Sequence, residues 1–181
     1  MVSSLLLVLV LGGVEADGVT PRVCGVKALF SSLTVLGVHC ELTEVERRLQ
    51  PGGGADRLSL ADLRRTAESF GACPLVVRMS TVDELTRGAV VHMDSRAGHF
   101  LTFLGFEEGD LVLTDAPIPP VRVDRNYFMQ HWTGHALVFF GSDRERTEYR
   151  SRLTIREWLY WGALLWPIVA LSIVCWCRWR R

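Results

Sequence analysis

Three side chains in this sequence have the types and order needed for nucleophilic catalysis: Cys24, His99 and Asp115. Cys24 opens a segment with helical apolar spacing, and a helix N-terminus stabilises a thiolate through its N–H groups and its dipole. His99 begins a strand-like run, and Asp115 ends the strand that returns after a hairpin turn. Because two hairpin-paired strands can place a carboxylate beside an imidazole, these residues could serve as nucleophile, general base and orienting group.

Each of these residues also has a simpler interpretation. A Cys in the first turn of a helix is often a small buried apolar residue, and an Asp before Ala-Pro is often a turn residue. Cys40 and Cys73 leave another alternative, a structural domain in which one of them forms a disulfide with Cys24. From the residue pattern alone, these alternatives remain open.

The composition favours a globular protein with no nucleic-acid partner. The chain has 181 residues and zero formal net charge, with 20 Lys and Arg against 20 Asp and Glu. Hydrophobic residues make up 49%, which fits a folded core. The middle of the chain has no basic stripe of the kind that binds nucleic acid. Its Gly52–Gly54 loop lacks the Lys-Ser/Thr of a phosphate loop, and no Cys/His spacing suggests zinc, so we expect neither nucleotide nor cofactor.

The two apolar ends predict export and membrane attachment. Residues 1–16 contain a short apolar core followed by small residues, as in a signal peptide. Residues 158–177 form an uncharged run flanked by Trp and Tyr, long enough for one membrane-spanning helix. We therefore expect a single-pass membrane protein whose domain over 17–142 lies outside the cytoplasm, followed by a charged linker over 143–157 and, after the span, a basic tail over 178–181.

Helix signals precede strand signals in the middle of the chain, which predicts an α+β domain with an antiparallel meander. Thr43 and Ser59 are each followed three residues later by an acidic residue, the pattern of a capping box. Periodicity predicts helices over 24–36, 43–50, 59–70 and 81–84, strands over 74–79, 89–93, 98–105 and 111–114, a short helix over 124–131 and a last strand over 136–140.

Four short motifs resemble one peptidase family. They are Cys24–Leu29, Gly98–Phe100, Asp115–Pro117 and the aromatic pattern from Phe128 to Gly134. This set is similar to the papain-like bacteriocin-processing peptidases, family thirty-nine of the cysteine peptidases, best known as the N-terminal domain of peptide-exporting ABC transporters. The resemblance covers about residues 17–140.

This resemblance implies a papain-like fold and a peptide or protein substrate. It implies that Cys24 is the nucleophile, that His99 is the general base and that Asp115 orients His99. It also implies cleavage of peptide bonds, typically after a Gly-Gly leader.

Two features depart from the family pattern. The family usually carries a Gln six residues before the Cys, where it completes the oxyanion hole, and this sequence has Gly18 there. Loss of one oxyanion donor typically lowers the rate by about 10²–10³. The sequence also predicts only one membrane span and no nucleotide site, unlike a transporter. The alternative function is therefore a peptidase-like domain that binds peptides without efficient hydrolysis.

Overall fold

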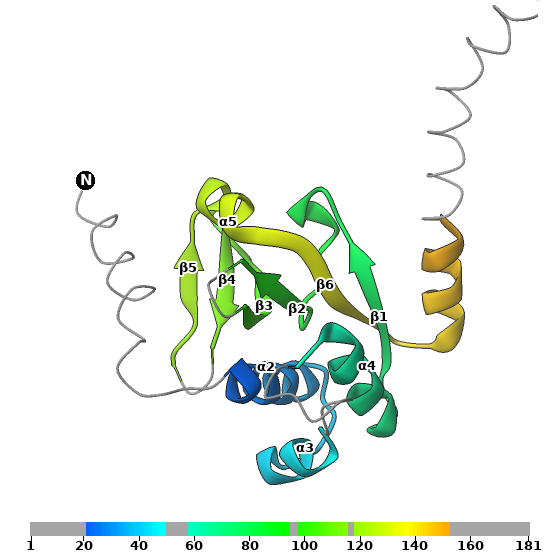
Figure 1. Cartoon of the computed structure of the whole chain (residues 1–181). Coiled ribbons are helices and arrows are strands. Elements are labelled where there is room, and N and C mark those ends of the chain that lie inside the picture. Colours follow the sequence, from blue (N-terminus) through cyan, green and yellow to red (C-terminus); the bar gives the residue numbers. More distant parts are fainter. Residues whose placement is uncertain (1–20, 50–57, 95–97, 116–117, 153–181) are drawn as a thin grey trace, which may run out of the picture. The chain divides into compact units, whose positions relative to one another are not determined.

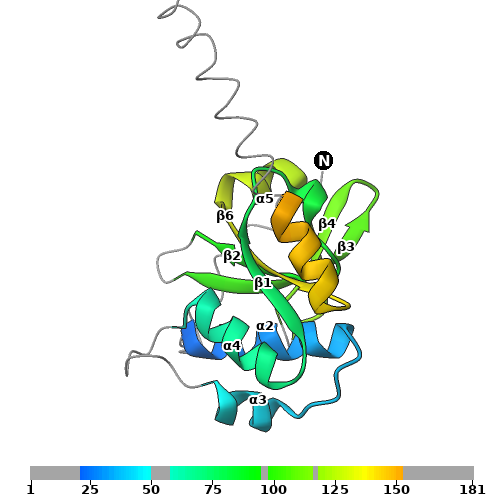
Figure 2. The same cartoon turned by 90° about the vertical axis from the view of Figure 1, so that its right-hand side faces the viewer.

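The computed structural model describes residues 21–49, 58–94, 98–115 and 118–152. One compact unit ends at Gly141 and a second begins at Ser142. In the first unit, three helices precede the strands: α2 (Pro21–Val35), α3 (Leu42–Arg48) and α4 (Leu60–Ser69). They gather on one side of the strands, and α5 (Arg125–His131) lies on the other side (Figures 1 and 2).

Six antiparallel strands form the sheet, in the order β1-β6-β2-β3-β4-β5. This confirms the α+β class and the antiparallel sheet. Strands β2 to β5 form a meander, but the last strand pairs between β1 and β2, so the prediction of a simple meander was wrong. The strands are β1 (Cys73–Arg78), β2 (Val90–Met93), β3 (His99–Glu107), β4 (Asp110–Thr114), β5 (Val121–Val123) and β6 (Trp132–Phe140).

The burial pattern of β6 explains its central place. Residues 136–139 are buried at four consecutive positions, so both faces of this strand are covered. A strand that is apolar on both faces belongs inside a sheet rather than at its edge. Strand β6 also begins at Trp132, earlier than predicted.

The capping prediction was right at one helix and wrong at another. Ser59 and Asp62 form the reciprocal capping box of α4. At α3 the N-cap is Glu41, which makes no side-chain cap hydrogen bond. Thr43 lies inside that helix, so its hydroxyl donates to the Glu41 carboxylate at 3.5 Å instead of capping. The predicted helix after Thr81 is a short 3-10 helix, η2 (Val82–Glu84), with Thr81 as its N-cap.

A core between the helices and the sheet sets the position of α2. Leu29 and Leu33 of α2 are completely buried and belong to one cluster with Phe100 and Leu137 of the sheet. Gly25 is close-packed there, because a Cβ on it would lie 2.8 Å from Leu58 Cδ1 and 3.4 Å from Phe100 Cδ2. The N-terminal part of α2 is therefore pressed against the start of β3.

The second unit contributes a helix over residues 143–152, within the predicted linker. It carries the ion pairs Arg146–Asp143 and Arg144–Glu148 on its own surface. None of the helices in the described ranges has the length and hydropathy of a membrane span. The predicted signal peptide over 1–16, the predicted membrane helix over 158–177 and the basic tail over 178–181 lie outside those ranges.

Candidate active site

Cys24 is the fourth residue of α2, in its first turn. The helix begins three residues earlier than predicted, which leaves the thiol inside the turn where the positive end of the helix dipole acts. Cys24 is 7% exposed, so it lies largely within the protein. The thiol therefore faces groups that the protein itself supplies.

His99 is the first residue of β3, as the sequence predicted, and pairs across the sheet with Met93. The preceding residue, Gly98, has φ +73°. A Cβ on Gly98 would lie 2.9 Å from Nε2 of His92. The backbone conformation therefore favours glycine just before His99, and a Cβ there would also force the end of the His92 ring to shift.

Replacing Gly98 with Ala should destabilise the protein more than the same change at Gly71. Gly71 also has positive φ, at +80°, but a Cβ there would meet nothing within 4 Å. We expect Gly71→Ala to lower the free energy of unfolding by about 1–2 kcal/mol and Gly98→Ala by about 2–4 kcal/mol, the excess being the clash with His92. Urea unfolding of both variants measures the difference, and equal losses would contradict the close contact.

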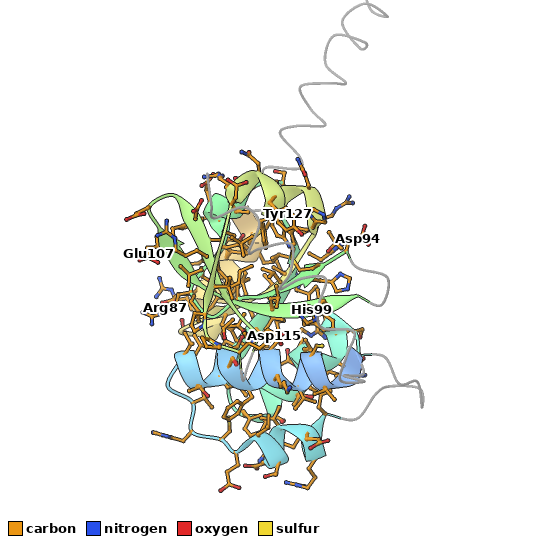
Figure 3. The ribbon with its side chains drawn as sticks, turned by 90° about the vertical axis from the view of Figure 1, so that its left-hand side faces the viewer. Arg87, Asp94, His99, Glu107, Asp115 and Tyr127 are labelled. Carbon is orange, nitrogen blue, oxygen red and sulfur yellow. The ribbon has the colours of Figure 1, made fainter. Side chains whose placement is uncertain are left out.

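Asp115 directly follows β4, whose last residue Thr114 pairs with Thr102 of β3. This pairing places the carboxylate beside the start of β3, and His99 Nε2 lies 3.1 Å from Asp115 Oδ2. His99 also makes a hydrogen bond with the thiol of Cys24. Since Asp115 takes Nε2, the remaining ring nitrogen, Nδ1, is the one that serves the thiol. His99 and Asp115 lie over α2 (Figure 3).

The three residues proposed from the sequence are thus brought together, each by a different element. Helix α2 carries Cys24, β3 carries His99, and the turn after β4 carries Asp115. Burial opposes the charged imidazolium, but the hydrogen bonds with Asp115 and Cys24 and the negative charge of both partners outweigh it and raise the pKa of His99 to about 9. His99 therefore holds a proton at neutral pH beside the thiol.

A second imidazole, His92, lies close to His99, and nothing in the sequence pattern gave it a role. The hydroxyl of Thr133 donates to the carbonyl oxygen of His92 and lies 3.2 Å from its Nδ1. Burial, together with the positive charges of His135 and His99, lowers the pKa of His92, although Asp94 acts in the opposite direction. A neutral His92 adds no repulsion to a charged His99. Only the pairing of β2 with β3 and β6 reveals this neighbour.

In the described part of the chain, Cys24 and Cys40 carry free thiols, and Cys24 forms no disulfide with Cys40 or Cys73. The alternative of a domain held by a disulfide from Cys24 was therefore wrong. Burial and the carboxylate of Glu44 raise the pKa of the Cys40 thiol. Gly18, at the position of the family's oxyanion Gln, lies outside the described residues.

Comparison with known proteins places this chain in one family. Residues 19–144 match the family model of the Peptidase C39 family. An uncharacterised protein of Methanothermobacter marburgensis is 28% identical over 116 residues, which cover 64% of this chain and 80% of that protein.

Two solved structures share the fold. One is a double glycine motif protease from an AMS/PCAT transporter in complex with the leader peptide, with a TM-score of 0.55, 22% identity and coverage of 64% of this chain and 82% of that chain. The other is the peptidase domain of Streptococcus ComA, a bifunctional ABC transporter involved in a quorum-sensing pathway. Its TM-score is 0.58 and its sequence identity is 17%, and the match covers 68% of this chain and 95% of that chain. Since the family model matches more than half of the sequence, this chain belongs to the Peptidase C39 family, the cysteine peptidase family that its motifs resemble.

Proposed function

We propose that this protein is a membrane-anchored cysteine peptidase that hydrolyses peptide bonds through Cys24, His99 and Asp115, after a Gly-Gly pair in leader-type peptides. The observation that carries this proposal is that the imidazole of His99 interacts with both the thiol of Cys24 and the carboxylate of Asp115. Membership of a peptidase family and a fold shared with a double glycine motif protease support it. The uncharged run over 158–177 supports the anchor.

The proposed reaction has two steps, with His99 moving a proton in each. The thiol proton is held by His99 while the sulfur of Cys24 attacks the carbonyl carbon of the substrate. His99 then gives that proton to the leaving amine as the C–N bond breaks, which leaves a thioester on Cys24. A water molecule next loses a proton to His99 and attacks the thioester, which releases the new carboxyl group and restores the thiol. Asp115 holds the ring of His99 in place throughout.

One observation favours a second function, a peptide-binding module with little hydrolysis. The position of the oxyanion Gln is occupied by Gly18, which has no side chain to donate. Such a module would bind a Gly-Gly peptide and leave it intact. The reactivity of Cys24 separates the two functions, because only the peptidase needs an activated thiol.

Alkylation of the full chain in detergent at pH 6 tests the proposal. Cys24 should react with iodoacetamide at least about tenfold faster than Cys40, with the modified residues identified by peptide mapping. Cys40 is a sharp internal reference because its side chain is more exposed than that of Cys24, while the pKa of its thiol is raised. Faster reaction of the more buried residue cannot come from access. A Cys24 that reacts no faster than Cys40 would favour the binding module.

A further inference from the structure

Two buried hydroxyl groups attach α2 to β3 and to the turn before β2. Thr102 Oγ1 donates to the backbone oxygen of Ala28 at 2.8 Å, and Ser32 Oγ donates to the backbone oxygen of Gly88 at 2.6 Å. Both side chains are completely buried. The first bond holds the helix one turn after Cys24, and the second holds it two turns after Cys24.

Thr102 occupies a particular place relative to the three residues of the site. It lies three residues after His99 on β3. Its neighbour across the sheet on β4 is Thr114, the residue directly before Asp115. Its hydroxyl contacts α2 one turn beyond Cys24. Thr102 therefore lies on the strand that carries His99, pairs with the strand that precedes Asp115, and makes a hydrogen bond to the helix that carries Cys24.

A second contact between α2 and β3 near the site is apolar and has little directional preference. Phe100 packs against Gly25, on the same face of β3 as Thr102. Hydrophobic contact sets how close the helix comes but not its position along the strand. A hydrogen bond between two fixed atoms does set that position.

We propose that Thr102 is a positioning residue, whose hydrogen bond to Ala28 holds Cys24 of α2 in reach of His99 on β3. This inference rests on the proposed peptidase function. Without the bond between Thr102 and Ala28, α2 and β3 keep their apolar contact. The helix can then shift slightly along the strand, which moves the Cys24 thiol away from the His99 imidazole. Small displacements of this kind weaken both the thiol–imidazole hydrogen bond and the attack on substrate.

Three variants of the full chain in detergent test this inference. Thr102→Val removes the hydroxyl but keeps the shape of the side chain, and Thr102→Ser keeps the hydroxyl. Ser32→Ala is the matched control, since it removes the equivalent buried bond at the far end of the same helix. For each variant we would measure the pH profile of Cys24 alkylation, kcat and KM on a quenched-fluorescent Gly-Gly peptide, and the urea midpoint.

Thr102→Val should lower the rate of Cys24 alkylation at pH 6 and kcat by about tenfold, with KM nearly unchanged. Thr102→Ser should keep the alkylation rate and kcat of the parent. Ser32→Ala should leave the alkylation rate and kcat within about twofold of the parent. Its urea midpoint should nevertheless fall as far as that of Thr102→Val, because each variant loses one buried hydrogen bond. Equal effects of Thr102→Val and Ser32→Ala, or a parent-like profile of Thr102→Val, would overturn the inference.

The outcomes remain informative if one variant fails to fold. If Thr102→Val does not fold, Thr102→Ser still tests the inference. A folded Thr102→Ser that keeps the pH profile of Cys24 alkylation would support the inference, and a folded Thr102→Ser that loses this profile would overturn it. A parent protein whose Cys24 is no more reactive than Cys40 is a different result, because it removes the proposed peptidase function itself.

Discussion

Replacing Cys24 with Ser is expected to reduce hydrolysis of a Gly-Gly leader peptide to background, a loss of at least about 10⁴-fold in kcat/KM. The serine hydroxyl holds its proton far more tightly than a thiol does, so it would not give that proton to His99 as the thiol does, and the nucleophile would stay unactivated. The measurement is a quenched-fluorescence assay on the full chain in detergent.

Cys40→Ser is the matched control for this experiment. It makes the same chemical change at another free thiol of the same unit, which packs against the core between the helices and the sheet. We expect it to retain the kcat/KM of the parent. If Cys24→Ser hydrolyses the peptide as fast as Cys40→Ser does, Cys24 is not the nucleophile and the proposed function fails.

Replacing Asp115 with Asn is expected to lower kcat by about 10²–10⁴ and to change the pH dependence of the reaction. Asn keeps the size of the side chain but removes the negative charge that lies 3.1 Å from His99 Nε2. The ring then loses a partner that only accepts hydrogen bonds and a charge that raises its pKa. Because the thiol remains in place, activity should stay measurable above that of Cys24→Ser.

The direction of the pH effect follows from the role of His99. In the parent, His99 must be protonated to hand a proton to the leaving amine, so kcat/KM should fall as the pH rises through about 9. In Asp115→Asn, the pKa of His99 is lower, and this alkaline decline should move to lower pH. The favourable contribution of the charged His99 to stability should likewise be complete below its unfolded pKa, near 6.5, and disappear as the pH rises through about 9.

Asp124→Asn is a suitable control for the charge change. Asp124 caps α5 by accepting from the backbone N–H of Tyr127, and Asn caps helices equally well. In Asp124→Asn, kcat/KM should therefore still fall as the pH rises through about 9, as in the parent. An unshifted decline in Asp115→Asn would show that this carboxylate does not govern the proton of His99.

The order and local setting of the site residues could be predicted from the sequence. Cys24 at a helix start, His99 at a strand start and Asp115 after the returning strand each depend on short-range signals: helical spacing, a hairpin turn and a strand end. The Ser59 capping box is equally local, and it formed as predicted. One element that such signals missed is β5, which follows two prolines and has only three residues, too few to show an alternating pattern. Another is the helix over 143–152, within the predicted linker.

Features that depend on pairing over long distances could not be predicted. The position of β6 depends on the sum of contacts on both of its faces, and sequence spacing carries no record of which strand lies next to it. The same is true of His92, which comes close to His99 only because β2 pairs with β3. The bond from Thr102 to Ala28 joins residues far apart in the chain, so a buried threonine in a strand gave no sign of its partner.

The place of β6 in the sheet also has a consequence for how this protein is made. Strand β1 pairs with β6, and β2 needs β6 on one side, so neither is fully paired until Phe140 has left the ribosome. Long-range pairing of this kind forms slowly, because a large loop must close first. We expect the nascent chain to remain incompletely folded, and without a working site, until nearly the whole unit has been synthesised.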